Sequence, residues 1–247
     1  MLPEGKPLAG KVALITGGGR RIGRAIALAF AASGADVVIT FRESGAAAQE
    51  VAKLARARGV RCLLWKGDLR RNEAPAELVA AVMGEFGCLD VLVNNAGKYE
   101  TAEFAHMSDA SWDAMLATNL TAPFRLSREA LPHLRAARGR IINLSSIGAR
   151  RAFPTHAHYC AAKAGLDHLT RAMARALAPE VQVNAIAPGL IAFEAELTPW
   201  EAKMRERTPL QRTGTGADVA ETAVFLAACT PFLTGQVIAV DGGLAMI

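Results

Sequence analysis

The chain has 247 residues, of which 51% are hydrophobic and 21% charged, and its formal net charge at pH 7 is +5. This length and apolar content suffice to bury the core of one large α/β domain, so we expect a single domain over residues 1–247. No run of about 18 apolar residues occurs, and the start "MLPEGKPLAGKVAL" lacks the pattern of a signal peptide. We therefore expect no membrane partner and a soluble, cytoplasmic protein.

The cysteines and basic residues exclude two further classes of site. The basic residues are mostly arginines in short pairs such as Arg70-Arg71, without interleaved stacking aromatics, so we expect no nucleic-acid partner. The cysteines are scattered, with no CxxC pair and no histidine at ligand spacing, which predicts free thiols and no metal site. They are Cys62, Cys88, Cys160 and Cys229.

Apolar runs rich in Val, Ile and Leu alternate with longer amphipathic segments along the chain. The runs predict strands at 11–16, 35–41, 60–65, 89–95, 139–145, 181–187 and 235–240. The amphipathic segments predict helices at 21–33, 45–58, 73–86, 109–135, 158–178 and 216–229. Because the runs are apolar on both faces, the pattern predicts a Rossmann-type, doubly wound parallel sheet of about seven strands with helices on both faces.

The stretch "ITGGGRRIG" follows the first predicted strand, where a doubly wound sheet binds phosphate. Gly17, Gly18 and Gly19 allow a tight turn and bring N–H groups close to a pyrophosphate, and the helix starting near Arg21 points its positive end at the same anion. Arg21 stands where such loops usually have a glycine, and we interpret it as an added ligand for the pyrophosphate and the substrate. A tight turn without a ligand is the alternative that the glycines alone leave open.

The second predicted strand ends in "VVITFRES". A carboxylate at this place would bind the adenosine ribose 2′-hydroxyl and repel a 2′-phosphate, but this chain has Phe41 and Arg42. Arg42, together with Arg20 of the first turn, can donate several hydrogen bonds to a 2′-phosphate. The sequence therefore predicts NADPH as the cofactor, with two solvated surface arginines as the alternative.

The motif "YCAAK" places Tyr159 and Lys163 four residues apart on a predicted helix, on one face. An ammonium beside a phenol favours the phenolate and lowers its pKa toward the working range of an acid/base catalyst. Ser145 and Ser146 end the fifth predicted strand, at the sheet edge where a substrate carbonyl can receive a hydrogen bond. Together these residues predict a catalytic site rather than an ordinary surface pair of a helix.

Residues 190–215 interrupt the alternation of strands and helices, and a long excursion of this kind predicts a substrate lid. Trp200 and Met204 in this segment either close over an apolar ligand or pack between helices. The histidines of "THAHY", His156 and His158, lack a third metal ligand nearby and are interpreted as a wall of the substrate pocket.

The resemblance to a known family rests on "TGGGRRIG" (16–23), Asp68, "NNAG" (94–97), "TNL" with Asn119, Ser146, "YCAAK", "NAIAPG" (184–189) and "TGQVIAVDGG" (234–243). In this order over nearly the whole chain, these motifs resemble those of the classical short-chain dehydrogenase/reductase family. The resemblance implies that Tyr159 is the acid/base, that Lys163 binds the nicotinamide ribose and lowers the tyrosine's pKa, and that Ser146 orients the substrate carbonyl. It further implies that Asn119 holds a helix bend and a water of the proton relay, and that the protein is a homotetramer. The implied cofactor contacts are Gly17, Gly19, Arg20, Arg21, Ile22, Arg42, Asp68, Leu69, Asn95, Ala96, Gly97, Tyr159, Lys163, Pro188, Gly189 and Ile191.

Within this family, "GRRIG" and "NNAGKY" resemble the pteridine reductase and dihydromonapterin reductase branch. In that branch an aromatic residue at the position of Tyr99 stacks on a flat pterin. We therefore expect an NADPH-dependent reductase of a small-molecule substrate of the pterin or dihydropterin type. The predicted substrate contacts are Arg21, Tyr99, Ser146 and Phe193.

Other residues depart from this branch and keep an alternative open. Ser146 and Gly97 stand where pteridine reductases usually have Asp and Ser, and Phe193 replaces a common threonine. The alternative substrate is a simple carbonyl compound, such as a 3-oxoacyl thioester of acyl-carrier protein. A nucleotide-binding protein without catalytic activity is a third hypothesis, which the combination of Asn119, Ser146, Tyr159 and Lys163 argues against.

Overall fold

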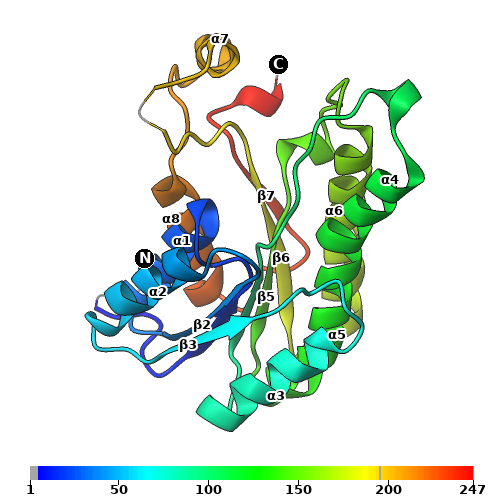
Figure 1. Cartoon of the computed structure of the whole chain (residues 1–247). Coiled ribbons are helices and arrows are strands. Elements are labelled where there is room, and N and C mark those ends of the chain that lie inside the picture. The colour runs from blue at the N-terminus through cyan, green and yellow to red at the C-terminus, as the bar shows by residue number, and fades with distance from the viewer. Residues whose placement is uncertain (1–4, 195, 247) are drawn as a thin grey trace.

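One parallel sheet organises the chain. The computed structural model describes residues 5–194 and 196–246, and within them seven strands pair in the order β3-β2-β1-β4-β5-β6-β7 (Figure 1). The strands are β1 (Val12–Ile15), β2 (Asp36–Phe41), β3 (Cys62–Lys66), β4 (Val91–Asn94), β5 (Arg140–Leu144), β6 (Gln182–Pro188) and β7 (Val237–Val240). The predicted doubly wound parallel sheet is confirmed. Residues 1–4, 195 and 247, which include one position of the predicted lid, lie outside the described residues.

Helices cover both faces of the sheet (Figure 1). One face packs against α1 (Arg21–Ala32), α2 (Gly45–Arg56) and α8 (Gly216–Ala228), and the other against α3 (Ala74–Phe86), α5 (Ala122–Ala136) and α6 (Ala157–Leu177). Alternate residues of β1 face opposite ways: Ala13 and Ile15 belong to the first layer, and Val12 and Leu14 to the second. This two-sided burial is the reason that the strands read as continuous apolar runs.

Two helical predictions differ from the structure. The segment 109–135, predicted as one helix, is α4 (Asp109–Leu116) and α5 joined by a π-helical turn, η2 (Ala117–Thr121). The excursion 190–215 contains a short helix, α7 (Pro199–Arg207), whose first turn carries a capping box between Thr198 and Glu201. Among the residues that the structure describes, no helix has both the length and the apolar character needed to cross a membrane.

The strand order determines where a ligand can bind. β1 pairs with β2 on one side and with β4 on the other, so the chain winds in opposite directions from this point. All strands are parallel, and their carboxyl ends therefore lie along one edge of the sheet. A crevice forms at this edge between the loops that leave β1 and β4, which is the binding position in doubly wound folds.

Candidate active site

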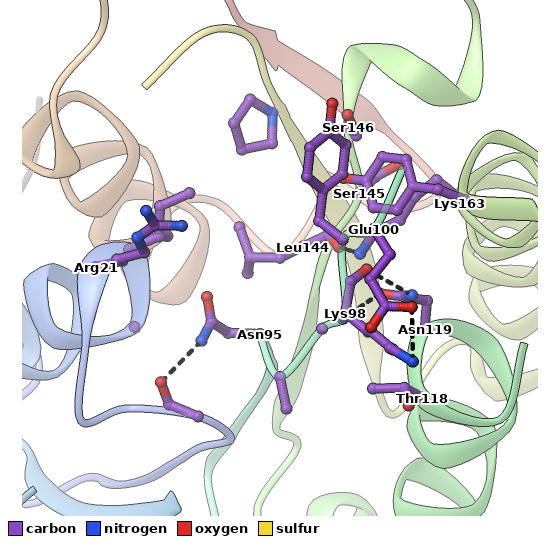
Figure 2. A pocket seen from close by; sticks show the side chains of 18 of the residues that line it. Arg21, Asn95, Lys98, Glu100, Thr118, Asn119, Leu144, Ser145, Ser146 and Lys163 are labelled. Atoms are coloured by element: carbon purple, nitrogen blue, oxygen red, sulfur yellow. Dashed lines mark hydrogen bonds and ion pairs between the residues drawn. The ribbon is translucent and has the colours of Figure 1, made fainter. Parts of the chain in front are cut away.

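A cleft of about 1560 Å³ opens at the carboxyl edge of the sheet. Its walls come from the loops after β1, β2, β4, β5 and β6 and from the excursion before α8. Figure 2 shows Arg21 on one side of the cleft and Ser146 and Lys163 on the other. The predicted catalytic, cofactor and substrate residues line this cleft except Gly19, whereas Gly18 and His158 lie outside it.

Glycines at the floor of the cleft permit a close approach of the backbone. Gly17 has a φ of +65°, and a Cβ there would lie 3.1 Å from the Cα of Ala96. A Cβ on Gly23 would lie 2.3 Å from the carbonyl oxygen of Gly17. Arg20, the N-cap of α1, has no acceptor atom in its side chain, so the first N–H groups of the helix stay uncapped. The loop therefore presents a helix N-terminus to an anion.

Gly18 and Gly19 allow neighbouring elements to pack closely against the loop. Gly19 lies outside the cleft, and a Cβ there would lie 3.3 Å from the backbone of Ala48 in α2. A Cβ on Gly18 would lie 2.9 Å from the side chain of Ile39 in β2. The glycine at position 19 allows α2 to pack closely against the loop, and the contact of Gly19 with the cofactor stays a prediction.

Arg21 adopts a backbone conformation that favours glycine. Its φ is +49°, in the left-handed region where a side chain is strained. Its guanidinium lies over the ring of Phe193, 5.4 Å from the centroid, and both residues line the cleft. A glycine at this position would adopt the left-handed backbone without strain. Arg21 instead adds a cation to the cleft, and its backbone is strained.

This strain predicts an inverted order of stability for two substitutions. Arg21→Ala and Arg21→Gly remove the same cation–π contact, but only alanine keeps the strained left-handed backbone. We expect the alanine variant to be less stable than the glycine variant by about 1 kcal/mol in urea unfolding. Arg24, in the interior of α1, is the matched control and should show the opposite order, because alanine favours a helix more than glycine does. If the alanine and glycine variants had the same order of stability at positions 21 and 24, this would contradict backbone strain at Arg21.

The end of β2 presents Arg42 to the cleft among acidic neighbours. Its guanidinium lies 2.7 Å from Glu43 and 3.8 Å from Asp68. The Nε of Arg70 donates to Asp68 at 3.0 Å, and this bond holds the pKa of the Asp68 carboxyl at about 2. Arg20 also lines the cleft, and so does Ser44, the N-cap residue of α2. The two predicted arginines thus face the same cleft as a helix N-terminus, which together suit a phosphate.

Asn119 lies in the π-helical turn between α4 and α5 and is fully buried. Its Nδ2 donates to the carbonyl oxygens of Lys98 at 3.0 Å and Met115 at 3.2 Å, while its Oδ1 accepts from the N–H of Lys98 (Figure 2). The side chain thereby ties the helix bend to the segment that follows β4. These contacts match the bend-holding role that the resemblance implies.

Ser146 and Tyr159 meet at the opposite side of the cleft. Ser146 begins the short turn η3 (Ile147–Ala149), and its Oγ accepts from the N–H of Gly148 at 3.0 Å. A hydroxyl that accepts in this way retains its own hydrogen for donation. The Ser146 hydroxyl also hydrogen-bonds to the phenol of Tyr159. One carbonyl oxygen can therefore receive both hydroxyl groups.

Lys163 is buried beneath Tyr159. Its Nζ donates to the carbonyl oxygen of Leu144 at 2.6 Å and lies 5.8 Å from the centroid of the Tyr159 ring. Burial raises the pKa of Tyr159 to about 12, and the bond from Ser146 only partly opposes this. The effect of Lys163 on the pKa of Tyr159 stays a prediction, because the ammonium is bound to a backbone carbonyl here and burial is the largest influence on the phenol. Burial therefore favours the protonated phenol.

An aromatic cluster borders the catalytic residues. Tyr99 stacks on His156, with ring centroids 4.4 Å apart, and lies edge-on to Tyr159 at 4.9 Å. The two ring nitrogens of His156 pair with the hydroxyls of Thr101 and Thr155. Of the two predicted pocket histidines, His156 lines the cleft but His158 does not. His158 is fully buried, and neither of its ring nitrogens has a partner among the described residues.

Residues of the excursion 190–215 form the remaining wall of the cleft. Two further residues of the wall, Lys98 and Glu100, were not predicted from the sequence. Phe193, Trp200 and Met204 line the cleft, in agreement with a lid. Lys98 and Glu100 form an ion pair of 2.9 Å in its wall (Figure 2). Their signal was present in "NNAGKYE", directly after the nucleotide-binding motif. Among residues 5–194 and 196–246, no group of three or more His, Cys, Asp or Glu side chains could hold a metal.

Comparisons with known proteins agree with this geometry. Residues 18–245 match a family model described as Enoyl-(Acyl carrier protein) reductase. The chain is 38% identical to the 3-oxoacyl-[acyl-carrier-protein] reductase FabG of Staphylococcus epidermidis, covering 96% of this chain and 99% of that protein. It is 42% identical to an uncharacterized oxidoreductase of Mycobacterium tuberculosis, with 95% and 92% coverage.

A solved structure gives the same result. A short-chain dehydrogenase from Burkholderia cenocepacia, in complex with NADP, has a TM-score of 0.92 and 34% identity, covering 96% of this chain and 99% of that one. The match extends from end to end, and it includes the sheet and the cleft described above. The chain belongs to the short-chain dehydrogenase/reductase family of oxidoreductases.

Proposed function

We propose that this chain is an NADPH-dependent carbonyl reductase that acts on 3-oxoacyl thioesters. The observation that carries the proposal is the end-to-end similarity to a 3-oxoacyl-[acyl-carrier-protein] reductase, at 38% identity. Ser146 and Gly97, which depart from the pteridine reductase pattern, fit this substrate class. The pterin substrate expected from Arg21 and Tyr99 receives no support from the comparisons.

The residues of the cleft fit a dinucleotide phosphate. Gly17 and Gly23 allow a tight turn, because a Cβ there would collide with Ala96 or with the Gly17 carbonyl, and the uncapped first turn of α1 follows it. Arg42 and Arg20 supply cations for a 2′-phosphate, in agreement with a relative that was solved with NADP. When bound, NADPH supplies the hydride. Arg21, Ile22, Asp68, Leu69 and the segments around Asn95 and Gly189 would hold the rest of the cofactor.

Ser146 and Tyr159 act on the carbonyl oxygen of the substrate. The Ser146 hydroxyl donates a hydrogen bond that orients and polarises the carbonyl. Tyr159, whose raised pKa keeps it protonated, donates its proton to the oxygen as negative charge develops there. Lys163 stabilises the phenolate that remains, and Asn119 supports the helix bend through which that proton is replaced. The chain thus supplies orientation and one proton for each carbonyl reduced.

The substrate chain would lie under the excursion 190–215. Phe193, Trp200 and Met204 offer apolar surface to an acyl chain, and Tyr99 forms the facing aromatic wall. Apolar surface with few polar groups is the usual lining of such sites. The homotetrameric state and the cytoplasmic location stay predictions, of which light scattering checks the first.

The substrate assignment is tested by NADPH oxidation. Acetoacetyl-CoA and an acetoacetyl thioester of acyl-carrier protein are compared with dihydrobiopterin and dihydrofolate at equal concentrations. We expect kcat/KM for a thioester to exceed that for either pterin by about a hundredfold or more, a difference of roughly 2.7 kcal/mol in transition-state binding. Turnover of a pterin alone would overturn the proposal. Tight NADPH binding without any turnover would instead support a non-catalytic nucleotide-binding protein.

A further inference from the structure

Three consecutive residues at the end of β5, Leu144 to Ser146, interact with three residues of α6 that are one helical turn apart. The carbonyl oxygen of Leu144 accepts from Lys163, at 2.6 Å. The hydroxyl of Ser145 donates to the carboxylate of Asp167. Ser146 hydrogen-bonds to Tyr159. The first and last of these contacts belong to the proposed catalytic machinery, and the middle one has no role in it so far.

Asp167 is a carboxylate buried in the protein interior. The residue is only 4% exposed and does not line the cleft, so it cannot contact the substrate or the cofactor there. Its Oδ2 lies 3.8 Å from Nε of Arg150, whose side chain is half exposed. A buried carboxylate is costly unless it is paired, which makes this position unsuited to mere packing. Here Ser145 and Arg150 pair with the carboxylate, and Lys163 lies one helical turn before it in α6.

We propose that Asp167 is a positioning residue for carbonyl reduction: its carboxylate, one helical turn beyond Lys163 on the same buried face of α6, keeps the Lys163 ammonium charged. The proposal deepens the proposed function and rests on it for the catalytic role of Lys163. Residues four apart on a helix are neighbours, and the attraction between opposite charges is strong in a buried setting. Ser145 keeps the carboxylate pointed into this arrangement.

The charges around Lys163 agree with this assignment. Burial lowers the pKa of Lys163 to about 8, and the charge of Asp167 opposes that effect. On the remaining sides Lys163 meets the Tyr159 ring, the Leu144 carbonyl, and Gly97, where a Cβ would lie 3.8 Å from its Nζ. The groups that face Asp167 are Ser145, Arg150, Arg171 and Lys163; all four lower its pKa, but burial is the larger effect and the pKa of Asp167 is raised.

The sign of the expected effect follows directly. A lysine is charged below its pKa and loses its charge as the pH rises through that value. Without Asp167, burial alone would act on Lys163, and its ammonium would be lost at lower pH. Removal of Arg150 should do the opposite, because a cation that competes for Asp167 disappears. A merely structural role would not move the titration of Lys163 in two directions.

The test is a titration of Lys163 in the full-length protein by NMR. The chain has seven lysines, so ¹³C-lysine labelling gives few signals, and a Lys163→Arg variant assigns the one of interest. We expect Asp167→Asn to lower the midpoint of Lys163 by about one pH unit or more, and Arg150→Gln to raise it. Ser145→Ala, which leaves both charges in place, should shift the midpoint less than Asp167→Asn does.

Unchanged midpoints, or shifts in the same direction for Asp167→Asn and Arg150→Gln, would overturn the proposal. If Asp167→Asn fails to fold, Arg150→Gln alone decides, because only a raised midpoint agrees with the proposal. The alkaline limb of kcat/KM should follow the midpoint in each variant, and a limb that stays in place would contradict the positioning role. The NMR titration needs no turnover, so a wild-type protein that reduces no carbonyl refutes the proposed function but leaves the effect of Asp167 measurable.

Discussion

Replacement of Tyr159 by phenylalanine is expected to lower kcat for carbonyl reduction by about 10²- to 10⁴-fold, because the substrate oxygen loses its proton donor. The ring still packs between Tyr99 and Lys163, so the fold and the cleft should persist. NADPH affinity, measured by fluorescence titration, should change by less than about threefold, since the loss concerns the chemical step. Steady-state NADPH oxidation with acetoacetyl-CoA measures kcat.

The chain provides a matched control, because Tyr99 is its only other tyrosine. Tyr99→Phe keeps the stack on His156 and removes a hydroxyl that is outside the proposed proton transfer. We expect its kcat to fall far less than that of Tyr159→Phe. Losses of similar size in the two variants would show that the aromatic cluster, and not one phenol, determines the rate.

Arg42→Ala is expected to raise KM for NADPH by about ten- to a hundredfold, because a charge-assisted hydrogen bond contributes roughly 1.5–3 kcal/mol. KM for NADH should stay nearly constant, because NADH has no 2′-phosphate. The measurement is the ratio of kcat/KM for the two cofactors with one carbonyl substrate. A loss that is equal for NADPH and NADH would place Arg42 elsewhere than at the 2′-phosphate.

Variants of Glu43 and Arg24 distinguish a specific contact of Arg42 from an effect of the surrounding surface charge. Glu43 pairs with Arg42 at 2.7 Å, so Glu43→Gln should free the guanidinium and improve discrimination in favour of NADPH. Arg24 lies in a recess outside the cleft, and Arg24→Ala should leave the ratio unchanged. A fall in the ratio for Arg24→Ala would point to the net charge of this surface instead of a specific contact.

The sequence by itself was sufficient for the order of strands and helices and for most of the site. The strands are apolar on both faces, and that property is local, so the runs could be recognised without a structure. Many of the site residues could be found because they stand in turns directly after strands, and parallel strands bring those turns to one edge. The segments around Gly17, Asn95, Ser146 and Gly189 all met in one cleft for this reason. Tyr159 and Lys163 were found from their spacing on one helix.

The tertiary structure decided the features that depend on contacts across the sequence. Gly19 allows the close packing of α2, which the sequence does not reveal because its neighbour Ala48 lies far along the chain. Burial by the surrounding elements raises the pKa of Tyr159, an effect that the spacing of Tyr159 and Lys163 in the sequence does not reveal. In the sequence Asp167 was an ordinary helix residue, and only the structure shows that its carboxylate is buried and bound by Ser145. Local patterns determine which elements form, whereas desolvation and electrostatics depend on what surrounds a group in space.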